Sequence, residues 1–274
     1  AIQWRDNIPL LGWLLLRGRC RSCARPISAR YPLVELLTAV LFVVVYCLEI
    51  PAGRLVNVQQ SCLYSPDGPQ VITALWTPEV WMHVRYALHM LMICGLIVAT
   101  FIDLELRIIP DGCTVPVMFV AVLTAVTCGQ VHIVPLWFQD LSVVRTLRPS
   151  LPDGWQFLMF YWDAVPFSMQ HPHWHGLLVS VAGLLAGGGV VWLVRLVGFW
   201  VLRQEAMGFG AVVLMAMVGS VLGWQPAVAA FFAAPLIAVF AAVLAWISKR
   251  DREIPYGPWL SLSTILLLLT WPWT

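Results

Sequence analysis

Long apolar runs dominate the chain, and polar residues do not alternate with apolar ones inside them. A helix needs about 20 such residues to cross the hydrocarbon core of a bilayer. Stretches such as LLTAVLFVVV also lack the alternation of a barrel strand, and an isolated segment in lipid satisfies its own backbone only as a helix. We therefore predict an all-α, polytopic membrane helix bundle with seven spans, at residues 33–50, 86–102, 114–128, 176–200, 209–223, 227–247 and 258–273.

The composition narrows the classes of protein further. Of the 274 residues, 60% are hydrophobic and 11% are charged, and the formal net charge is +2. A soluble domain carries about 25% charged residues, which it needs to cover its core with polar surface. The small net charge also provides no basic field for binding nucleic acid. These values exclude a cytosolic enzyme and a nucleic-acid binder, and they make membrane lipid the expected surroundings.

The distribution of basic residues predicts the orientation, because cytoplasmic loops are enriched in lysine and arginine. If residues 1–32 lie inside, the predicted outer loops are 51–85 and 129–175, and they hold only Arg54, Arg85, Arg145 and Arg148. The inner segments hold Arg5, Arg17, Arg19, Arg21, Arg25, Arg30, Arg107, Arg203, Lys249, Arg250 and Arg252. We therefore expect a cytoplasmic segment at 1–32 and a membrane bundle at 33–274.

Two inner ends of predicted spans carry candidate chemistry. Asp103 lies at the end of the second span, and Pro110 is expected to end that helix a few residues later. An ionisable residue at such a place usually faces a cavity. A solvated loop with Asp103 paired to Arg107 is an equally simple interpretation. The other end carries Gly208-x-Gly210 before Ala211, which permits a tight bend, although helix packing explains these glycines equally well.

Cysteine and histidine pairs raise the question of metal binding. Cys20 and Cys23 have the spacing that holds one side of a tetrahedral zinc, but structural zinc takes four ligands and the chain has no second pair of this kind. A reduced or redox-active pair is the alternative. His171, His173 and His175 could bind a metal weakly, but polar groups at the membrane interface account for them more simply.

Small residues recur four apart in two of the predicted spans. Gly183 with Gly187, and Gly219 with Gly223, form small-xxx-small pairs. Such pairs let two membrane helices approach closely. They predict tight helix packing and imply no chemistry.

Taken together, the motifs resemble those of the prepilin peptidases. The stretch DNIPLLGW, the LLLRGRCRSC run and PISARYPLVELLT are similar to the cytoplasmic signature of this family. IDLELRIIPD resembles the segment around the first catalytic aspartate, which falls on Asp103. EAMGFG, followed by LMAMVGSVLGWQ, resembles the Gly-x-Gly-Asp segment that carries the second aspartate, with Gly208 and Gly210 as its glycines. The resemblance covers most of the chain.

The resemblance implies an aspartic endopeptidase that removes the leader from type IV pilin or pseudopilin precursors. It implies a multi-pass protein of the bacterial inner membrane whose active site faces the cytoplasm, and two carboxylates that share a proton. In this family an upstream CxxC completes a four-cysteine zinc site, so we expect one further CxxC and one further helix before residue 1. Some members also methylate the new N-terminus with S-adenosylmethionine.

One departure from the family pattern concerns the chemistry itself. Ala211 occupies the position of the second aspartate, and Val213 replaces the small polar residue or lysine usual two positions later. We therefore expect impaired cleavage, and three explanations stay open: an inactivating change, a naturally inactive relative, or rescue by Asp111 or Glu105. A non-catalytic pilin-binding or assembly protein of the same fold is the alternative function. A solute transporter is disfavoured, since the chain shows no inverted repeat.

Overall fold

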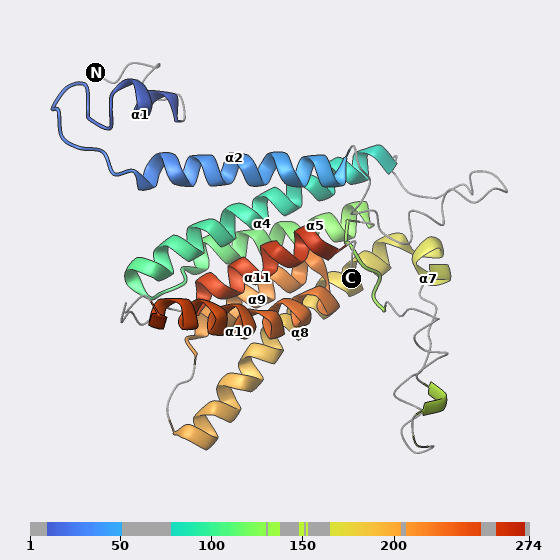
Figure 1. Cartoon of the computed structure of the whole chain (residues 1–274). Helices are drawn as coiled ribbons and strands as arrows, with labels where there is room; N and C mark the ends of the chain where they lie inside the picture. The colour runs from blue at the N-terminus through green and yellow to red at the C-terminus, as the bar shows by residue number, and fades with distance from the viewer. Residues whose placement is uncertain are drawn as a thin grey trace. The chain divides into compact units, whose positions relative to one another are not determined.

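The computed structural model describes residues 10–50, 78–129, 131–137, 148–150, 152, 165–203, 207–247 and 256–271. Within these ranges the chain is helical and contains no strand (Figure 1). Residues 1–9 and most of the two predicted outer loops, at 51–77, 138–147 and 153–164, lie outside the described residues. The elements are α1 (Leu11–Leu15), α2 (Arg30–Glu49), α4 (Pro78–Leu106), α5 (Asp111–Cys128), η2 (Arg148–Ser150), α7 (Val165–Gln170), α8 (Pro172–Leu202), α9 (Phe209–Leu222), α10 (Trp224–Ile247) and α11 (Gly257–Thr270).

Each of the seven predicted spans corresponds to one helix, in chain order α2, α4, α5, α8, α9, α10 and α11, which confirms the all-α bundle. The largest difference is at α4, which begins at Pro78 rather than near residue 86. Proline suits the first turn of a helix because the missing N–H would have no partner there. The placement of Arg85 in an outer loop is therefore wrong: Arg85 lies within α4 and is fully buried.

The burial pattern is that of a membrane protein. In the part of the chain that the structure describes, four helices are long and apolar enough to cross a membrane, namely Arg30–Glu49, Val80–Leu106, Asp111–Cys128 and Pro172–Val201, and three shorter helices are also apolar. Large apolar side chains lie on the outside, as with Leu236 at 73% exposed and Trp200 at 78%. Hydroxyls such as those of Ser180 and Ser220 are buried. Because soluble proteins bury apolar groups and expose polar ones, this arrangement fits lipid surroundings.

The first compact unit, residues 1–52, combines α1, a tight loop and α2. Arg19 and Pro26 form an isolated bridge across the loop, and the indole Nε1–H of Trp13 donates to the Ile27 carbonyl at 3.1 Å. The backbone N–H of Leu10 donates to the Glu35 carboxylate at 2.9 Å. Side chains of α1 and α2 therefore hold the cysteine-bearing loop between them.

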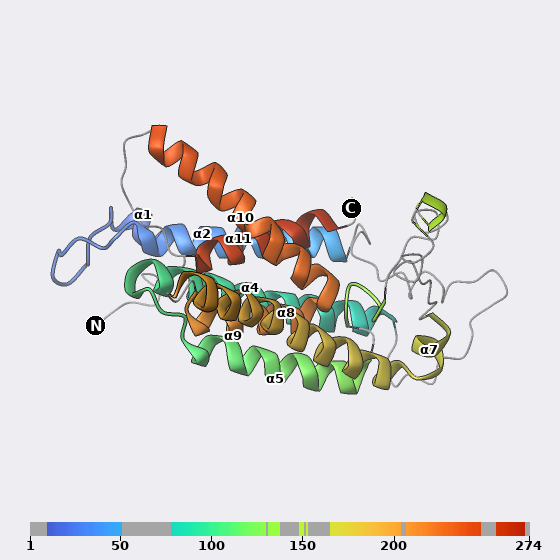
Figure 2. The same ribbon diagram turned by 90° about the horizontal axis from the view of Figure 1, so that it is seen from below.

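In the second unit, residues 53–274, backbone contact between α8 and α9 fixes the centre of the bundle. A Cβ on Gly183 would collide with the Gly219 carbonyl, and a Cβ on Gly219 would collide with the Gly183 carbonyl. This mutual approach confirms the packing predicted from the small-residue pairs. Helix α10 packs on α8 and α11, and α11 packs on α4. Figure 2 shows the C-terminal part of α10 extending away from the other helices.

A cluster of buried histidines lies beside the N-terminal half of α4, away from Asp103. The Leu136 N–H donates to Nε2 of His175 at 3.0 Å, and His132 and His89 are buried beside it. His173 lies in the first turn of α8, with Nδ1 2.8 Å from the Val126 carbonyl. The expectation that these histidines are interfacial loop residues is therefore wrong for His175, because α8 begins at Pro172 and turns His175 inwards.

This burial predicts that acid destabilises the fold. Desolvation, with the nearby His175 and His89 adding to it, lowers the pKa of His132 to about 3. Below the ordinary pKa of about 6.5 the unfolded chain takes up a proton there and the folded chain does not, so stability falls as the pH falls. We expect His132 to cost about 2 kcal/mol between pH 7 and pH 5, measured by thermal unfolding in detergent. His132→Gln should remove this contribution to the pH dependence, whereas His83→Gln, at an exposed histidine, should leave it in place.

Candidate functional site

Asp103 is a buried carboxylate in the last turn of α4. It is 7% exposed, although the neighbouring Leu104 and Glu105 are exposed. Its Oδ2 accepts the backbone N–H of Gly257, the first residue of α11, at 3.1 Å. A carboxylate removed from water needs such a donor, and the bond ties the end of α4 to the start of α11.

The break between α4 and α5 lies against the start of α9 as well as the start of α11. Arg107 adopts a positive φ of 56° after α4 ends, and Pro110, in extended conformation, is the N-cap of α5. This confirms the predicted interruption at Pro110. Ile109, inside the break, lies against two glycines: its Cδ1 is 3.2 Å from where a Cβ of Gly257 would stand, and its Cβ is 2.8 Å from where a Cβ of Gly210 would stand.

Ala211 follows Gly210 in the first turn of α9 and is 6% exposed. Through Ile109, the Ala211 end of α9 and the Asp103 end of α4 therefore meet at the same end of the bundle. The two glycines of the motif differ in their surroundings. Gly208, the N-cap of α9, has an ordinary φ of −67° and open space where a Cβ would stand, whereas a Cβ on Gly210 would collide with the Cβ of Ile109.

The other two candidate carboxylates, of Asp111 and Glu105, are not buried as Asp103 and Ala211 are. Asp111 is the first residue of α5 and is exposed. Glu105 is also exposed, as expected from its place two residues after Asp103 on the helix. The described part of the site thus contains one buried carboxylate, which can accept a proton from a water molecule. A second acid, able to donate a proton at the same time, is lacking where Ala211 stands.

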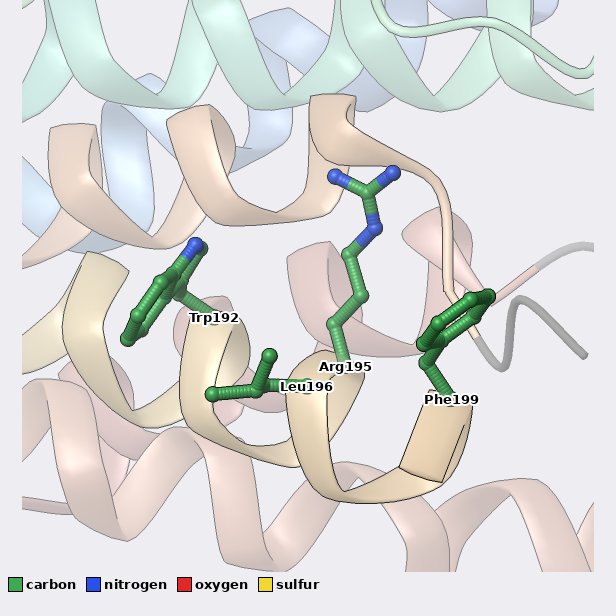
Figure 3. Close-up of a pocket in the computed structure, with 4 residues that line it drawn as sticks. All are labelled: Trp192, Arg195, Leu196 and Phe199. Atoms are coloured by element: carbon green, nitrogen blue, oxygen red, sulfur yellow. The ribbon is translucent and has the colours of Figure 1, made fainter. Parts of the chain in front are cut away.

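A cavity of about 180 Å³ lies beside the start of α9. Trp192, Arg195, Leu196 and Phe199 of α8 line it, and Figure 3 shows the Arg195 guanidinium pointing away from α8. This guanidinium lies over the ring of Phe209, 5.7 Å from its centroid, which is the geometry of a cation–π contact. The contact joins α8 to the residue immediately before Gly210.

The cysteine pair lies in the first unit, in the loop before α2. The Cys20 Sγ is 3.3 Å from the Ser22 hydroxyl, and the Cys20 backbone N–H donates to the Arg25 carbonyl. Hydrogen bonds, that of the Ser22 side chain above all, lower the pKa of Cys20 to about 6. The thiolate is the form that binds zinc. Among the described residues no group of three metal-binding side chains occurs, so this loop offers a metal ion at most the two thiols of Cys20 and Cys23.

Sequence reasoning proposed Asp103 and the Ala211 position, which the structure brings to the same end of the bundle, and did not point to Gly257 or Ile109. Neither residue type is chemically reactive, and their importance depends on which helix ends meet. The available signal was the Gly257-Pro258 pair at the start of an apolar run, because proline favours the first helical turn and leaves the preceding N–H exposed at the helix end.

Comparison with known proteins covers both units. The family model described as the Bacterial Peptidase A24 N-terminal domain matches residues 1–48. The chain is 30% identical over 271 residues to the prepilin leader peptidase/N-methyltransferase of Aeromonas hydrophila, covering 96% of this chain and 66% of that protein. It is 30% identical to the type 4 prepilin-like proteins leader peptide-processing enzyme of Escherichia coli O78:H11, over 97% of this chain and 70% of the other.

A prepilin leader peptidase/N-methyltransferase of Myxococcus xanthus is 28% identical over all of this chain and 79% of its own length. No solved structure matches the chain. The chain thus spans about two thirds of the length of the Aeromonas relative, and the apolar helices of both units agree with a multi-pass membrane protein. The matches to the N-terminal domain and to relatives along nearly the whole chain place this protein in the prepilin leader peptidase family.

Proposed function

We propose that this chain has the architecture of a membrane aspartic endopeptidase that removes the leader from type IV pilin or pseudopilin precursors. The observation that supports this best is the buried Asp103 carboxylate at a helix end that meets the start of α9. The names of the Aeromonas and Escherichia relatives describe the same activity.

The chemistry follows from the positions of the residues. In its ionised form, Asp103 takes a proton from a water molecule, and the water oxygen attacks the scissile carbonyl. A protonated carboxylic acid at position 211 would donate to that carbonyl oxygen, which is the role Ala211 cannot fill. With the site facing the cytoplasm at the inner membrane, the apolar stem of the precursor lies in lipid and its leader stays outside the bilayer. Loss of one positioned acid costs about 10²–10⁴ in rate.

The test is to restore the acid. Purified chain carrying Ala211→Asp is incubated with a pilin precursor in detergent or vesicles, and the new N-terminus is identified by mass spectrometry. We expect cleavage by this variant and little by the chain with Ala211 or with Ala211→Asn, which matches the size but supplies no acid. A folded Ala211→Asp protein that leaves every precursor intact would refute the peptidase proposal. Equal cleavage by the unmodified chain would instead refute the role of position 211.

Ala211 itself favours one alternative, a non-catalytic pilin-binding or assembly protein of the same fold. Buried apolar surface at this position stabilises the helix ends without supplying an acid. This alternative predicts that the precursor co-purifies with the unmodified chain. Ala211→Asp would then alter the affinity for the precursor without producing any cleaved pilin.

Two cofactors belong to the proposal. The relatives' names include N-methyltransferase, so S-adenosylmethionine is the methyl donor we propose for a second activity. Zinc, when bound, would order the loop between α1 and α2, with Cys20 and Cys23 supplying two thiolates. We expect zinc content, measured by atomic emission, to fall when both cysteines are changed to serine.

A further inference from the structure

The Asp103 carboxylate has a second, unassigned neighbour in the site, the start of α11. Gly257 is its first residue, and its backbone N–H donates to Asp103 Oδ2 although 154 residues separate the two along the chain. The bond is buried. An amide donor to an ionised acceptor makes a strong hydrogen bond, so this contact holds one oxygen of the carboxylate in place.

The sequence at the start of α11 leaves this particular donor available. The first N–H groups of a helix have no partner inside the helix. In α11 the second residue is Pro258, which has no N–H, and the next two N–H groups, of Trp259 and Leu260, both donate to the Tyr256 carbonyl. Gly257 is thus the residue of the first turn whose N–H points to Asp103, where the positive end of the helix dipole favours an anion.

Only glycine fits at this position. A Cβ on residue 257 would collide with Oδ2 of Asp103 and would stand 3.1 Å from its Cγ. The same Cβ would stand 3.2 Å from Cδ1 of Ile109, so both the Asp103 carboxylate and the Ile109 side chain would have to shift to admit it. Any side chain at 257 therefore displaces the carboxylate of Asp103, and displacement of a reacting group by about 1 Å can cost 10²-fold in rate.

From this geometry we infer that Gly257 is a positioning residue of the peptidase site. Its N–H fixes the direction of the Asp103 carboxylate, and its missing side chain leaves the space that the carboxylate occupies. The kinetic part of this inference rests on the proposed function, because it presumes that Asp103 takes part in cleavage. The contact itself can be tested without any activity.

The kinetic test uses the Ala211→Asp chain with Gly257→Ala added. We expect kcat to fall by about 10- to 100-fold with KM unchanged within about twofold, because substrate still binds while Asp103 is misdirected. Gly112→Ala is the matched control: Gly112 is the second residue of α5, where a Cβ would meet nothing within 4 Å, and its kcat should not change. An unchanged kcat in Gly257→Ala, or a loss that appears in KM alone, would overturn the inference.

The contact test uses the chain with its own Ala211 and measures thermal unfolding in detergent. We expect Gly257→Ala to lower the unfolding temperature by about 5 °C when Asp103 is present, and by less than about 2 °C in an Asp103→Ala background, where no carboxylate obstructs the new Cβ. Equal losses in both backgrounds would overturn the inference. Because this cycle needs no cleavage, failure of the Ala211→Asp chain to act on precursors would refute the proposed function and leave the contact to be decided by its own result.

Discussion

Replacing Asp103 by asparagine in the Ala211→Asp chain should lower precursor cleavage by about 10²–10⁴-fold. Asparagine has nearly the same size as aspartate, and its carbonyl oxygen can still accept the Gly257 N–H, so the helix ends should stay together. It cannot take a proton from water, however. Two groups that act as a unit lose about as much when either is removed, so the loss should approach that of the unrestored chain.

Glu105→Gln is the control for this experiment. Glu105 lies two residues from Asp103 on the same helix and is exposed, so cleavage should change by less than about twofold. Both variants are compared by initial rates on the same precursor, after size-exclusion chromatography has shown equal folding. A similar loss in both, or a loss confined to Glu105→Gln, would contradict the assignment of Asp103 as the reacting carboxylate.

Replacing Gly183 by alanine should destabilise the bundle by at least about 3 kcal/mol. The added methyl group would collide with the Gly219 carbonyl on α9, and backbone cannot move aside as the end of a flexible side chain can. The two helices must separate, which also loosens the neighbouring contact between Gly187 and the Met215 carbonyl. We expect a lower unfolding temperature in detergent and less folded protein in the membrane fraction.

Gly189→Ala tests whether the effect comes from the helix contact. Gly189 belongs to the same helix, is exposed, and has open space where a Cβ would stand. Alanine there should be neutral or stabilising by up to about 1 kcal/mol, because it favours helix more than glycine does. If Gly183→Ala and Gly189→Ala have the same effect, backbone contact between α8 and α9 is not what holds the centre of the bundle.

Much of the fold follows from hydrophobic patterning, because in lipid the backbone has few alternatives to a helix. The break at Pro110 and the approach of Gly183 to Gly219 also follow from local chemistry and agree with the structure. The start of α4 does not, since polar and charged residues between Pro78 and Arg85 resemble a loop when only their hydropathy is considered. The burial of Arg85 depends on neighbouring segments that hydropathy does not report.

The candidate site shows a similar division. Asp103 and the Ala211 position could be proposed as site residues because their residue types and motif spacing carry chemistry. Gly257 was not, because its contribution is a backbone N–H and an absent side chain, and both matter only once α11 is placed against α4. His175 was misplaced for a related reason: its burial follows from a helix start at Pro172 that a run of polar residues obscures.

The bond between Asp103 and Gly257 also has a consequence for biosynthesis. Residue 257 is synthesised 154 residues after Asp103, and α11 must then enter the membrane beside a helix inserted long before. A nascent chain that stalls ahead of this point holds its aspartate without the amide that orients it. The site is therefore complete only once α11 has been inserted, and termination upstream of α11 yields a protein whose Asp103 lacks this hydrogen bond.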